Sequence, residues 1–336
     1  MCTMRAAVLR DFSLGIQLED MAIPEPKPNQ VLVRILASGI CHTDLHAING
    51  SWDRKPILPL IPGHEGVGVI EALGSKVTGF TLDQKVLIPW IGRTCRTCSF
   101  CFNGIENYCE KQFNTGYIIP GTHAEYTAAD FRYIVPLAND IDPIQTAPLA
   151  CAGLTAFETI KQLRSNENQT LLIMGVGGVG HLAIQYAKEF FTRIIAIDPS
   201  ELRIAQAKLL GAETYSPEEW LSLNSKPLID AAAVFAADPR AVTDSINALK
   251  NGGTLALVGL GKHKELSLPW FELVTRGIRI LGSHVGPIST LKEVVEYHHL
   301  GKAKVLVESR PLADIHLAMA DLAAGINNSP RLVLVP

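Results

Sequence analysis

Four cysteines lie within one short stretch of the chain, at the spacing Cys95-x2-Cys98-x2-Cys101-x7-Cys109. Four thiolates in one loop suit a closed tetrahedral Zn2+ site with Zn–S bonds of about 2.3 Å, and they leave no coordination position open. The spacing therefore predicts a structural zinc ion that holds a lobe of the chain together and performs no chemistry. A pair of disulfides or an iron–sulfur cluster is the alternative, and the spacing alone does not exclude the cluster.

Three further cysteines stand apart, at Cys2, Cys41 and Cys151. Cys41 lies in GICHTDLH, Cys151 begins CAGLT, and a histidine, His64, lies in PGHEGVG. Two thiolates and one imidazole would leave the fourth position of a zinc ion open, as a catalytic zinc requires. Because these residues are far apart in the chain, their spacing also allows a simpler interpretation. In that interpretation each cysteine is a small buried hydrophobe and His64 is an ordinary hydrogen-bonded side chain.

A glycine-rich turn, Gly175-Val-Gly177-Gly178-Val179-Gly180, directly follows the strand-like run TLLIM and precedes a segment of helical period. This is the context that the dinucleotide-binding fingerprint G-x-G-x-x-G needs. The first glycine allows a tight turn, the second lets a pyrophosphate approach the backbone, and the third lets helix and strand pack closely. The N-terminus of the helix supplies partial positive charge. The turn therefore predicts a nucleotide site.

The choice of nucleotide depends on the end of the next strand-like run, RIIAI, where Asp198 stands. An acidic side chain there accepts hydrogen bonds from the adenosine ribose and repels a 2′-phosphate, which predicts NAD(H) over NADP(H). Arg203 lies nearby and would favour the phosphate instead. Strand, helix and Asp198 together favour a cofactor site over the alternative of a glycine turn that only permits close packing.

The elements that must position these residues follow two patterns. Up to about Pro148 the chain has short β-branched or apolar runs separated by proline and glycine clusters, which is typical of β structure. From about Cys151, apolar runs such as DAAAVFAA, TLALVGL and IRILGS alternate with segments of helical period. Repeated βα units predict a doubly wound parallel sheet with helices on both faces, an α/β fold. After about Gly286 the sequence predicts a helix over 289–300 and strands at KVLVESR and RLVLVP.

Composition limits the classes of function. The 336 residues suggest about two domains, and 47% hydrophobic with 19% charged residues is typical of a globular chain. A net charge of −3 without a block of Lys or Arg argues against nucleic acid as a partner. The first residues lack a secretory apolar core, and glycines interrupt the most apolar stretch, so neither secretion nor a membrane span is predicted. Seven cysteines, few and odd in number, favour the cytoplasm.

Taken together, these motifs resemble the zinc-dependent alcohol dehydrogenases of the medium-chain dehydrogenase/reductase superfamily, particularly their yeast and bacterial NAD-dependent branch. The motifs occur in the same order as in that family and span nearly the whole chain: GICHTDLH, PGHEGVG, the four-cysteine loop, CAGLTAF, GVGGVG and GSHVG. The resemblance implies a mostly-β GroES-like catalytic domain, residues 1–148 completed by 287–336, into which an NAD-binding Rossmann domain, 149–286, is inserted. It also implies hydride transfer between NAD and a primary or secondary alcohol, or its aldehyde or ketone. Two Zn2+ ions per chain and a homodimer or homotetramer are implied as well.

The resemblance also assigns roles around the metal. Cys41, His64 and Cys151 match the ligands of the catalytic zinc. Asp44 matches a carboxylate that orients the ligand histidine, which fixes the tautomer of the imidazole and raises its basicity. Glu65 matches an acidic residue beside the metal that joins its coordination in some members. Without the family, Asp44 would be interpreted as a helix N-cap and Glu65 as a surface acid.

Further matches concern proton transfer, cofactor and substrate. Thr43 matches the hydroxyl that receives the substrate proton, and His46 matches the histidine at the solvent end of the proton relay. His42 and Arg331 match positions that meet the pyrophosphate of the cofactor. Aromatic residues of the substrate pocket are matched by Trp52 and Trp90, although a tryptophan on composition alone is more often part of the core.

The sequence departs from the family at two places. Pro287 and Ile288 follow GSHVG where a short polar stretch with an arginine is usual. Pro120, Thr122 and His123 stand where relatives tend to have a small glycine-rich turn, so we expect a pocket of different shape.

Three rival functions stay open. A polyol dehydrogenase of the same superfamily commonly has a carboxylate at the position of Cys151. A zinc-free quinone or enoyl reductase would need neither set of cysteines. A non-catalytic nucleotide-binding relative would bind NADH without turnover.

Overall fold

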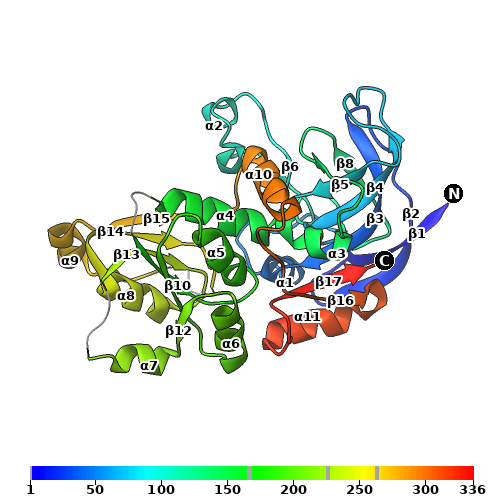
Figure 1. Ribbon diagram of the computed structural model, residues 1–336. Coiled ribbons are helices and arrows are strands. Elements are labelled where there is room, and N and C mark those ends of the chain that lie inside the picture. Colours follow the sequence, from blue (N-terminus) through cyan, green and yellow to red (C-terminus); the bar gives the residue numbers. More distant parts are fainter. Residues whose placement is uncertain (1, 165–168, 225–227, 262–264) are drawn as a thin grey trace. The chain divides into compact units, whose positions relative to one another are not determined.

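The computed structural model describes residues 2–164, 169–224, 228–261 and 265–336, which form two compact units (Figure 1). Unit 1 consists of Met1–Leu154 and Gly286–Pro336, and unit 2 consists of Thr155–Val285. Cys151 therefore belongs to unit 1. Among the described helices, none is both long and apolar enough to cross a lipid bilayer.

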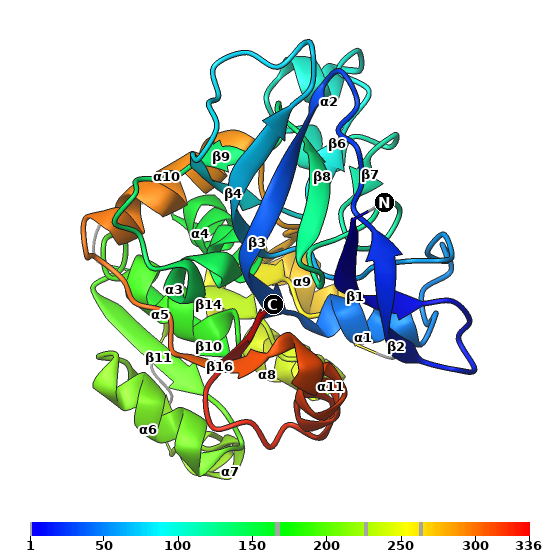
Figure 2. The ribbon, with the colours of Figure 1, turned by 90° about the vertical axis from the view of Figure 1, so that its right-hand side faces the viewer.

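Unit 1 is built on a seven-stranded sheet in the order β16-β17-β3-β4-β5-β9, with β8 also paired to β3. Figure 2 shows β3, β4 and β8 side by side. Only β16 and β17 are parallel. The strands of the sheet are β3 (Gln30–Ile40), β4 (Gly66–Leu73), β5 (Lys85–Ile88), β8 (Tyr126–Asp130), β9 (Val135–Pro136), β16 (Val307–Pro311) and β17 (Arg331–Val335).

The long strand β3 carries the core of this unit. Val31, Val33 and Ile35 alternate with less buried residues and pack against Ile70 and Val86 of the neighbouring strands. This period of two is what a strand with one buried face requires. The C-terminal strand β17 adds antiparallel to the far end of β3, with Leu334 opposite Ser38, so that the last strand of unit 1 lies beside one of the first.

Smaller elements complete unit 1. Two-stranded sheets are formed by β1 (Thr3–Leu9) with β2 (Ile16–Ala22) and by β6 (Ile91–Arg93) with β7 (Phe113–Asn114). The helices are α1 (His42–Ile48), α2 (Ser99–Phe102), α3 (Pro143–Thr146), α10 (Ile288–His299) and α11 (Ile315–Ala324), with short 3-10 turns η1 (Glu106–Tyr108), η2 (Ala147–Ala150) and η3 (Leu312–Asp314). The helix predicted over 289–300 is thus confirmed as α10.

Unit 2 contains a parallel six-stranded sheet in the order β12-β11-β10-β13-β14-β15. Its strands are β10 (Thr170–Met174), β11 (Arg193–Ile197), β12 (Glu213–Tyr215), β13 (Ile229–Val234), β14 (Leu249–Leu257) and β15 (Arg279–Gly282). Its helices are α4 (Ala152–Leu163), which begins in unit 1, α5 (Gly180–Ala187), α6 (Glu201–Leu209), α7 (Pro217–Ser222), α8 (Pro239–Ala248) and α9 (Trp270–Arg276).

The strand order explains how helices come to cover both faces of this sheet. From β10 the chain moves to β11 and β12 on one side, and it later returns to β13 and β14 on the other. Right-handed crossovers in these two directions place their helices on opposite faces. The doubly wound fold predicted from the βα alternation is therefore confirmed. The order reverses between β10 and β13, and ligands bind such sheets at the carboxyl ends of the strands beside a reversal.

One predicted strand is shorter than its sequence run. KVLVESR was expected to be extended throughout, but the ladder begins only at Val307, which lies opposite Arg331, the first residue of β17. The register of β16 is set by the strand it pairs with, and not by its own apolar run.

Candidate active site

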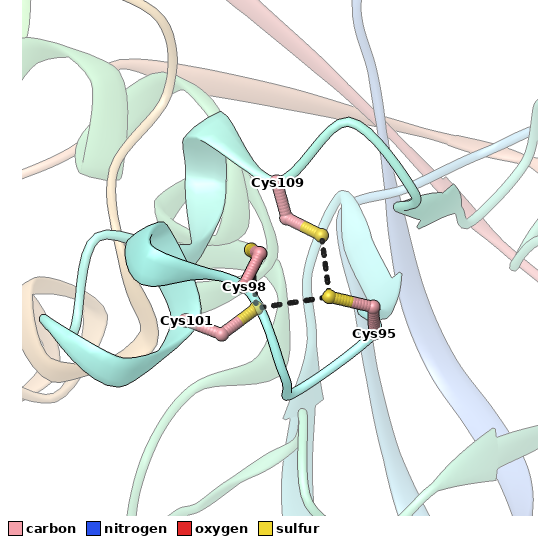
Figure 3. Close-up of side chains that lie close together, drawn as sticks. All are labelled: Cys95, Cys98, Cys101 and Cys109. Carbon is pink, nitrogen blue, oxygen red and sulfur yellow. Dashed lines mark hydrogen bonds between the residues drawn. The ribbon is translucent and has the colours of Figure 1, made fainter.

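The four-cysteine loop connects β6 to β7, and its sulfur atoms face one another (Figure 3). The Sγ atom of Cys101 lies 3.9 Å from that of Cys95 and 3.5 Å from that of Cys98, and the Sγ atoms of Cys95 and Cys109 are 3.6 Å apart. A tetrahedral zinc ion with bonds of about 2.3 Å requires S–S edges of about 3.8 Å. The distances are far from the roughly 2.05 Å of a disulfide. This loop therefore fits a tetrahedral metal ion.

The base of the loop is held by its surroundings. β6 and β7 pair beneath it, and the Arg93 guanidinium lies 3.8 Å from the centre of the Phe113 ring. The Ile288 N–H at the start of α10 donates to the Glu106 carboxylate at 2.8 Å. Within the loop, hydrogen bonds from Thr97 lower the pKa of the Cys95 thiol to about 5, which favours the thiolate that a metal needs.

A second group of metal-ligating side chains lies at the end of β3. One ligand atom from each of Cys41, His64, Glu65 and Cys151 lies within 4.8 Å of the others. Cys41 is the N-cap of α1, His64 and Glu65 directly precede β4, and Cys151 follows η2. The pairing of Ser38 with Gly66 aligns the ends of β3 and β4, which explains how residues distant in the chain meet.

Asp44 lies behind this group. Its carboxylate accepts the Cys41 N–H at 2.8 Å and the Gly63 N–H at 3.1 Å, and its Oδ1 lies 3.4 Å from His64 Nδ1. Burial raises the pKa of the Asp44 carboxyl, but the imidazoles of His64 and His123 outweigh burial and hold that pKa well below its usual range. Asp44 is therefore neither the N-cap of its helix nor exposed. It is a buried carboxylate facing the imidazole of His64.

The donor atoms of this group fit a metal ion. Both ring nitrogens of His64 are buried without a hydrogen-bond partner, and Nδ1 lies 3.4 Å from Asp44 Oδ1, so Nε2 is the nitrogen left for a metal ion. Hydrogen bonding to Cys151 lowers the pKa of the Cys41 thiol, and the same contact together with burial raises the pKa of Cys151. The lowered pKa favours the thiolate form of Cys41, which is the form that binds a metal ion. Two sulfurs and one orphaned imidazole nitrogen suit zinc.

Glu65 is buried and forms an ion pair with the equally buried Arg331 of β17. Burial raises the pKa of Glu65 to about 8, despite the neighbouring guanidinium. Glu65 is therefore not the surface acid that composition alone would suggest. The Arg331 guanidinium, matched in the sequence to a cofactor contact, is directed to Glu65 in this structure.

The other predicted residues of α1 lie along one short helix. Thr43 Oγ1 is 3.7 Å from Cys41 Sγ, and one turn later His46 Nδ1 is 2.7 Å from Ser51 Oγ. Burial, with a smaller contribution from His42, lowers the pKa of His46. His42 itself is exposed. A hydroxyl beside the metal ligands is thus followed by an imidazole nearer the surface.

Three aromatic rings, Trp52, Trp90 and Tyr117, form what we call the aromatic wall. Their ring centroids are 5.2 to 6.4 Å apart. Trp90 also lies edge-on to His64 at 5.0 Å, and Trp52 stacks on His46 at 5.2 Å. The wall therefore links the metal ligands to the histidine of α1.

In unit 2 the glycine turn follows β10, and α5 begins at Gly180, after Gly178 and Val179 complete the turn. Gly175 has φ +95°, and a Cβ there would lie 2.9 Å from the Ala236 nitrogen. A Cβ on Gly180 would lie 2.0 Å from the Gly175 carbonyl oxygen. By contrast, a Cβ on Gly177 would meet no atom within 4 Å. The chain itself thus requires glycine at the first and third positions, whereas the second faces open space that suits a pyrophosphate.

Asp198 lies beside this turn. Its carboxylate accepts the Val176 N–H at 2.7 Å and the Ser200 N–H at 2.9 Å. Two oxygens have more acceptor sites than these bonds use, so capacity remains for ribose hydroxyls. The Arg203 guanidinium donates to Gln206 at 2.9 Å.

Comparisons with known proteins decide the family. Residues 27–139 match the family model of the alcohol dehydrogenase GroES-like domain, and residues 178–298 match that of the zinc-binding dehydrogenases. An alcohol dehydrogenase of Geobacillus stearothermophilus is 38% identical over 98% of this chain and 99% of its own. The chain belongs to the zinc-dependent alcohol dehydrogenases. It is an enzyme that interconverts alcohols and carbonyl compounds, and its family uses zinc and a nucleotide cofactor.

Solved structures agree with this assignment. The alcohol dehydrogenase of the archaeon Aeropyrum pernix has a TM-score of 0.91 and 31% identity, with 99% of this chain and 100% of that chain covered. The acetophenone reductase of Geotrichum candidum, solved in complex with NAD, has a TM-score of 0.89 and 28% identity, with 99% and 97% covered. The GroES-like and Rossmann parts of the alcohol dehydrogenase fold are therefore both present.

Several residues of this alcohol dehydrogenase lie where the sequence did not place them. Tyr117 completes the aromatic wall, and no motif in the sequence pointed to it. Thr122 and His123, from which a pocket of different shape was expected, are both fully buried, and His123 lies behind Asp44. Pro287 and Ile288 start α10.

Proposed function

We propose that this chain is an NAD-dependent alcohol dehydrogenase with two Zn2+ ions per chain, a catalytic one at Cys41, His64 and Cys151 and a structural one at the four-cysteine loop. The observation that carries the catalytic assignment is the meeting of these ligand atoms within 4.8 Å, with His64 Nε2 buried and lacking a hydrogen-bond partner. The sulfur distances of 3.5 to 3.9 Å support the structural site. The match of residues 178–298 to the zinc-binding dehydrogenase family favours zinc over an iron–sulfur cluster.

A zinc ion at the first site supplies a Lewis acid that stabilises negative charge on the substrate oxygen, and NAD supplies the acceptor and donor of hydride. The chain's own residues prepare this chemistry. Asp44 lies 3.4 Å from Nδ1 of His64, which leaves Nε2 as the nitrogen that would bind the metal. The aromatic wall places apolar ring surface beside His64, and apolar surroundings strengthen electrostatic interactions.

Proton movement is assigned to α1. The Thr43 hydroxyl is proposed to accept the proton of the alcohol, and His46 is proposed to pass that proton to solvent. The lowered pKa of His46 supports this role, because the neutral imidazole is the form that accepts a proton. His42, exposed at the start of α1, is proposed to contact the pyrophosphate. The same contact is proposed for Arg331, whose buried guanidinium would have to turn from Glu65 to make it.

NAD is favoured over NADP by Asp198. Its carboxylate already accepts two backbone N–H groups, and a 2′-phosphate beside it would add a second negative charge. The NAD bound by the acetophenone reductase of Geotrichum candidum supports the same choice. Arg203 is proposed to lie near the ribose without reversing the preference.

The test is a substrate panel of simple alcohols, sorbitol and their carbonyl products, run in both directions with NAD and NADP, together with zinc analysis. We expect NAD-linked turnover of a simple alcohol and two zinc ions per chain. Turnover of sorbitol alone would favour a polyol dehydrogenase. NADH binding without turnover would contradict the enzymatic proposal.

The remaining assignments are also proposals. We assign the catalytic domain to residues 1–148 with 287–336 and the NAD-binding domain to 149–286. A homodimer or homotetramer is supported by α9, the helix that precedes the edge strand β15 in the chain, because its Trp270 and Phe271 are each 80% exposed. The mass in solution of the Trp270→Glu variant tests this interface.

A cytoplasmic location is also proposed. The seven cysteines all lie within the described residues and are free thiols, which is typical of a reducing compartment.

A further inference from the structure

His123 is a completely buried histidine that the proposed reaction does not use. It lies between β7 and β8, and its exposed fraction is 0%. A buried imidazole is costly unless its nitrogens find polar partners. The groups that face its two nitrogens therefore show what it does.

The backbone around His123 is bonded to the segment that leads into His64. The Gly121 N–H donates to the Ile61 carbonyl at 2.7 Å, and the His123 N–H donates to the Pro62 carbonyl at 3.0 Å. Gly63 has φ +94°, and a Cβ on it would lie 2.6 Å from Nδ1 of His123. The residue before His64 is thus held directly against the His123 ring.

The ring itself connects two buried polar groups. Its Nδ1 is 2.8 Å from the Ser38 hydroxyl, which is in turn 2.7 Å from the Thr122 hydroxyl. Its buried Nε2 has no hydrogen-bond partner, and the nearest carboxylate atom, Oδ2 of Asp44, lies 3.6 Å away, within reach of an electrostatic interaction but beyond a hydrogen bond. Ser38 is on β3, so this chain of contacts ties Asp44 to the central sheet.

Asp44 consequently lies between two imidazoles. Oδ1 faces His64 and Oδ2 faces His123, and each oxygen also accepts one backbone N–H. A carboxylate with a partner on every side has little freedom to rotate about its terminal bond. An Asp44 without His123 would lose the contact that opposes His64.

We propose that His123 is a positioning residue, which acts through Asp44 to fix the His64 imidazole and thereby raises the affinity of the Cys41–His64–Cys151 site for a divalent metal ion. The inference rests on the proposed catalytic zinc. Removing groups that orient a ligand histidine typically costs about 10- to 100-fold in metal affinity. The four-cysteine loop makes none of these contacts and serves as an internal reference.

Three variants separate positioning from packing. His123→Phe keeps a ring of similar size and removes both nitrogens. In His123→Gln the amide nitrogen stands close to the place of Nε2, which faces Asp44. In His123→Asn it stands close to the place of Nδ1, which faces Ser38. Only the glutamine variant can restore the contact with Asp44.

The experiment measures zinc retained per chain against a graded series of chelator concentrations, and the visible absorption of the Co2+-substituted full-length protein. The wild type and Cys151→Ser are measured first. If the wild type holds no zinc that Cys151→Ser loses, the proposed catalytic site fails, irrespective of His123.

If the wild type holds that zinc, we expect His123→Phe to release it at a chelator concentration at least about 10-fold lower than the wild type requires. The visible spectrum of the Co2+-substituted variant should be shifted as well. The zinc of the four-cysteine loop should be unchanged, and His123→Gln should recover more affinity than His123→Asn. Unchanged zinc retention and spectrum in His123→Phe would overturn the inference. If His123→Phe fails to fold, the glutamine and asparagine pair decides, because equal affinities in the two would also overturn it.

Discussion

Single Gly→Ala substitutions in the glycine turn of unit 2 should affect either the stability of the fold or the binding of the cofactor, depending on the position. Gly177→Ala places a Cβ where no atom lies within 4 Å, and Gly177 is not among the glycines with positive φ. The free energy of unfolding should therefore change by no more than about 0.5 kcal/mol. The same methyl stands where the pyrophosphate needs close approach to the backbone. We expect NADH affinity to fall about 10- to 100-fold, which corresponds to about 1.4 to 2.8 kcal/mol.

The first and third glycines should behave in the opposite way. Gly175→Ala forces a left-handed backbone angle on a residue with a side chain, at about 1 to 2 kcal/mol, in addition to the 2.9 Å contact with Ala236. Gly180→Ala drives a methyl to 2.0 Å from a carbonyl oxygen, and such overpacking costs about 1 to 3 kcal/mol. Both variants should unfold at lower temperature than the wild type without any nucleotide present.

The assay is thermal unfolding of each variant without nucleotide, followed by a fluorescence titration with NADH. Gly282→Ala is the matched control, because its Cβ also meets nothing within 4 Å and its φ is not positive. Wild-type NADH affinity in Gly177→Ala would refute the assignment of the open space to the cofactor. A large loss of stability in that variant would refute the packing assigned to the turn itself.

Further substitutions test the rest of the proposed site. Cys151→Ser should abolish turnover and lower bound zinc by about one ion per chain, and full activity would refute the ligand assignment. Asp198→Gly should shift the ratio of kcat/KM toward NADP(H), and an unchanged ratio would remove Asp198 from cofactor selection. His46→Gln should lose the acid limb of the pH–rate profile, because protonation of His46 as pH falls removes the proton acceptor; its lowered pKa keeps it neutral to lower pH than an ordinary histidine. Trp52→Ala should raise kcat/KM for a branched alcohol relative to ethanol by about 10-fold or more, measured by steady-state kinetics, and a constant ratio would exclude Trp52 from the pocket.

Local patterns predicted the fold well. The βα alternation after Cys151 indicated the doubly wound sheet, because short apolar runs that alternate repeatedly with segments of helical period are typical of parallel βα units. The glycine turn was located because it stands between such a run and such a segment. The start of β16 could not be predicted, since it depends on the register with β17, a strand that follows in the sequence only after α11.

Site residues that lie close together in the sequence could be predicted from their spacing, whereas residues far apart in the sequence could not. The four cysteines of the loop lie within one short segment, so their spacing carried the metal prediction. Cys41, His64 and Cys151 were joined through the family resemblance, because no spacing rule connects residues on three separate segments. The contact of Glu65 with Arg331 spans 266 positions and was not anticipated. His123 left no signal beyond being an unusual residue in its loop.

The pairing of Glu65 with Arg331 has a consequence for how the protein is made. Arg331 lies in β17, which the ribosome delivers only after the whole of unit 2 has been translated. A nascent chain that has not reached this strand already carries Cys41, His64 and Cys151, yet its Glu65 carboxyl lacks the countercharge beside which it is buried. The ion pair between Glu65 and Arg331 can therefore form only after one of the last strands has been synthesised.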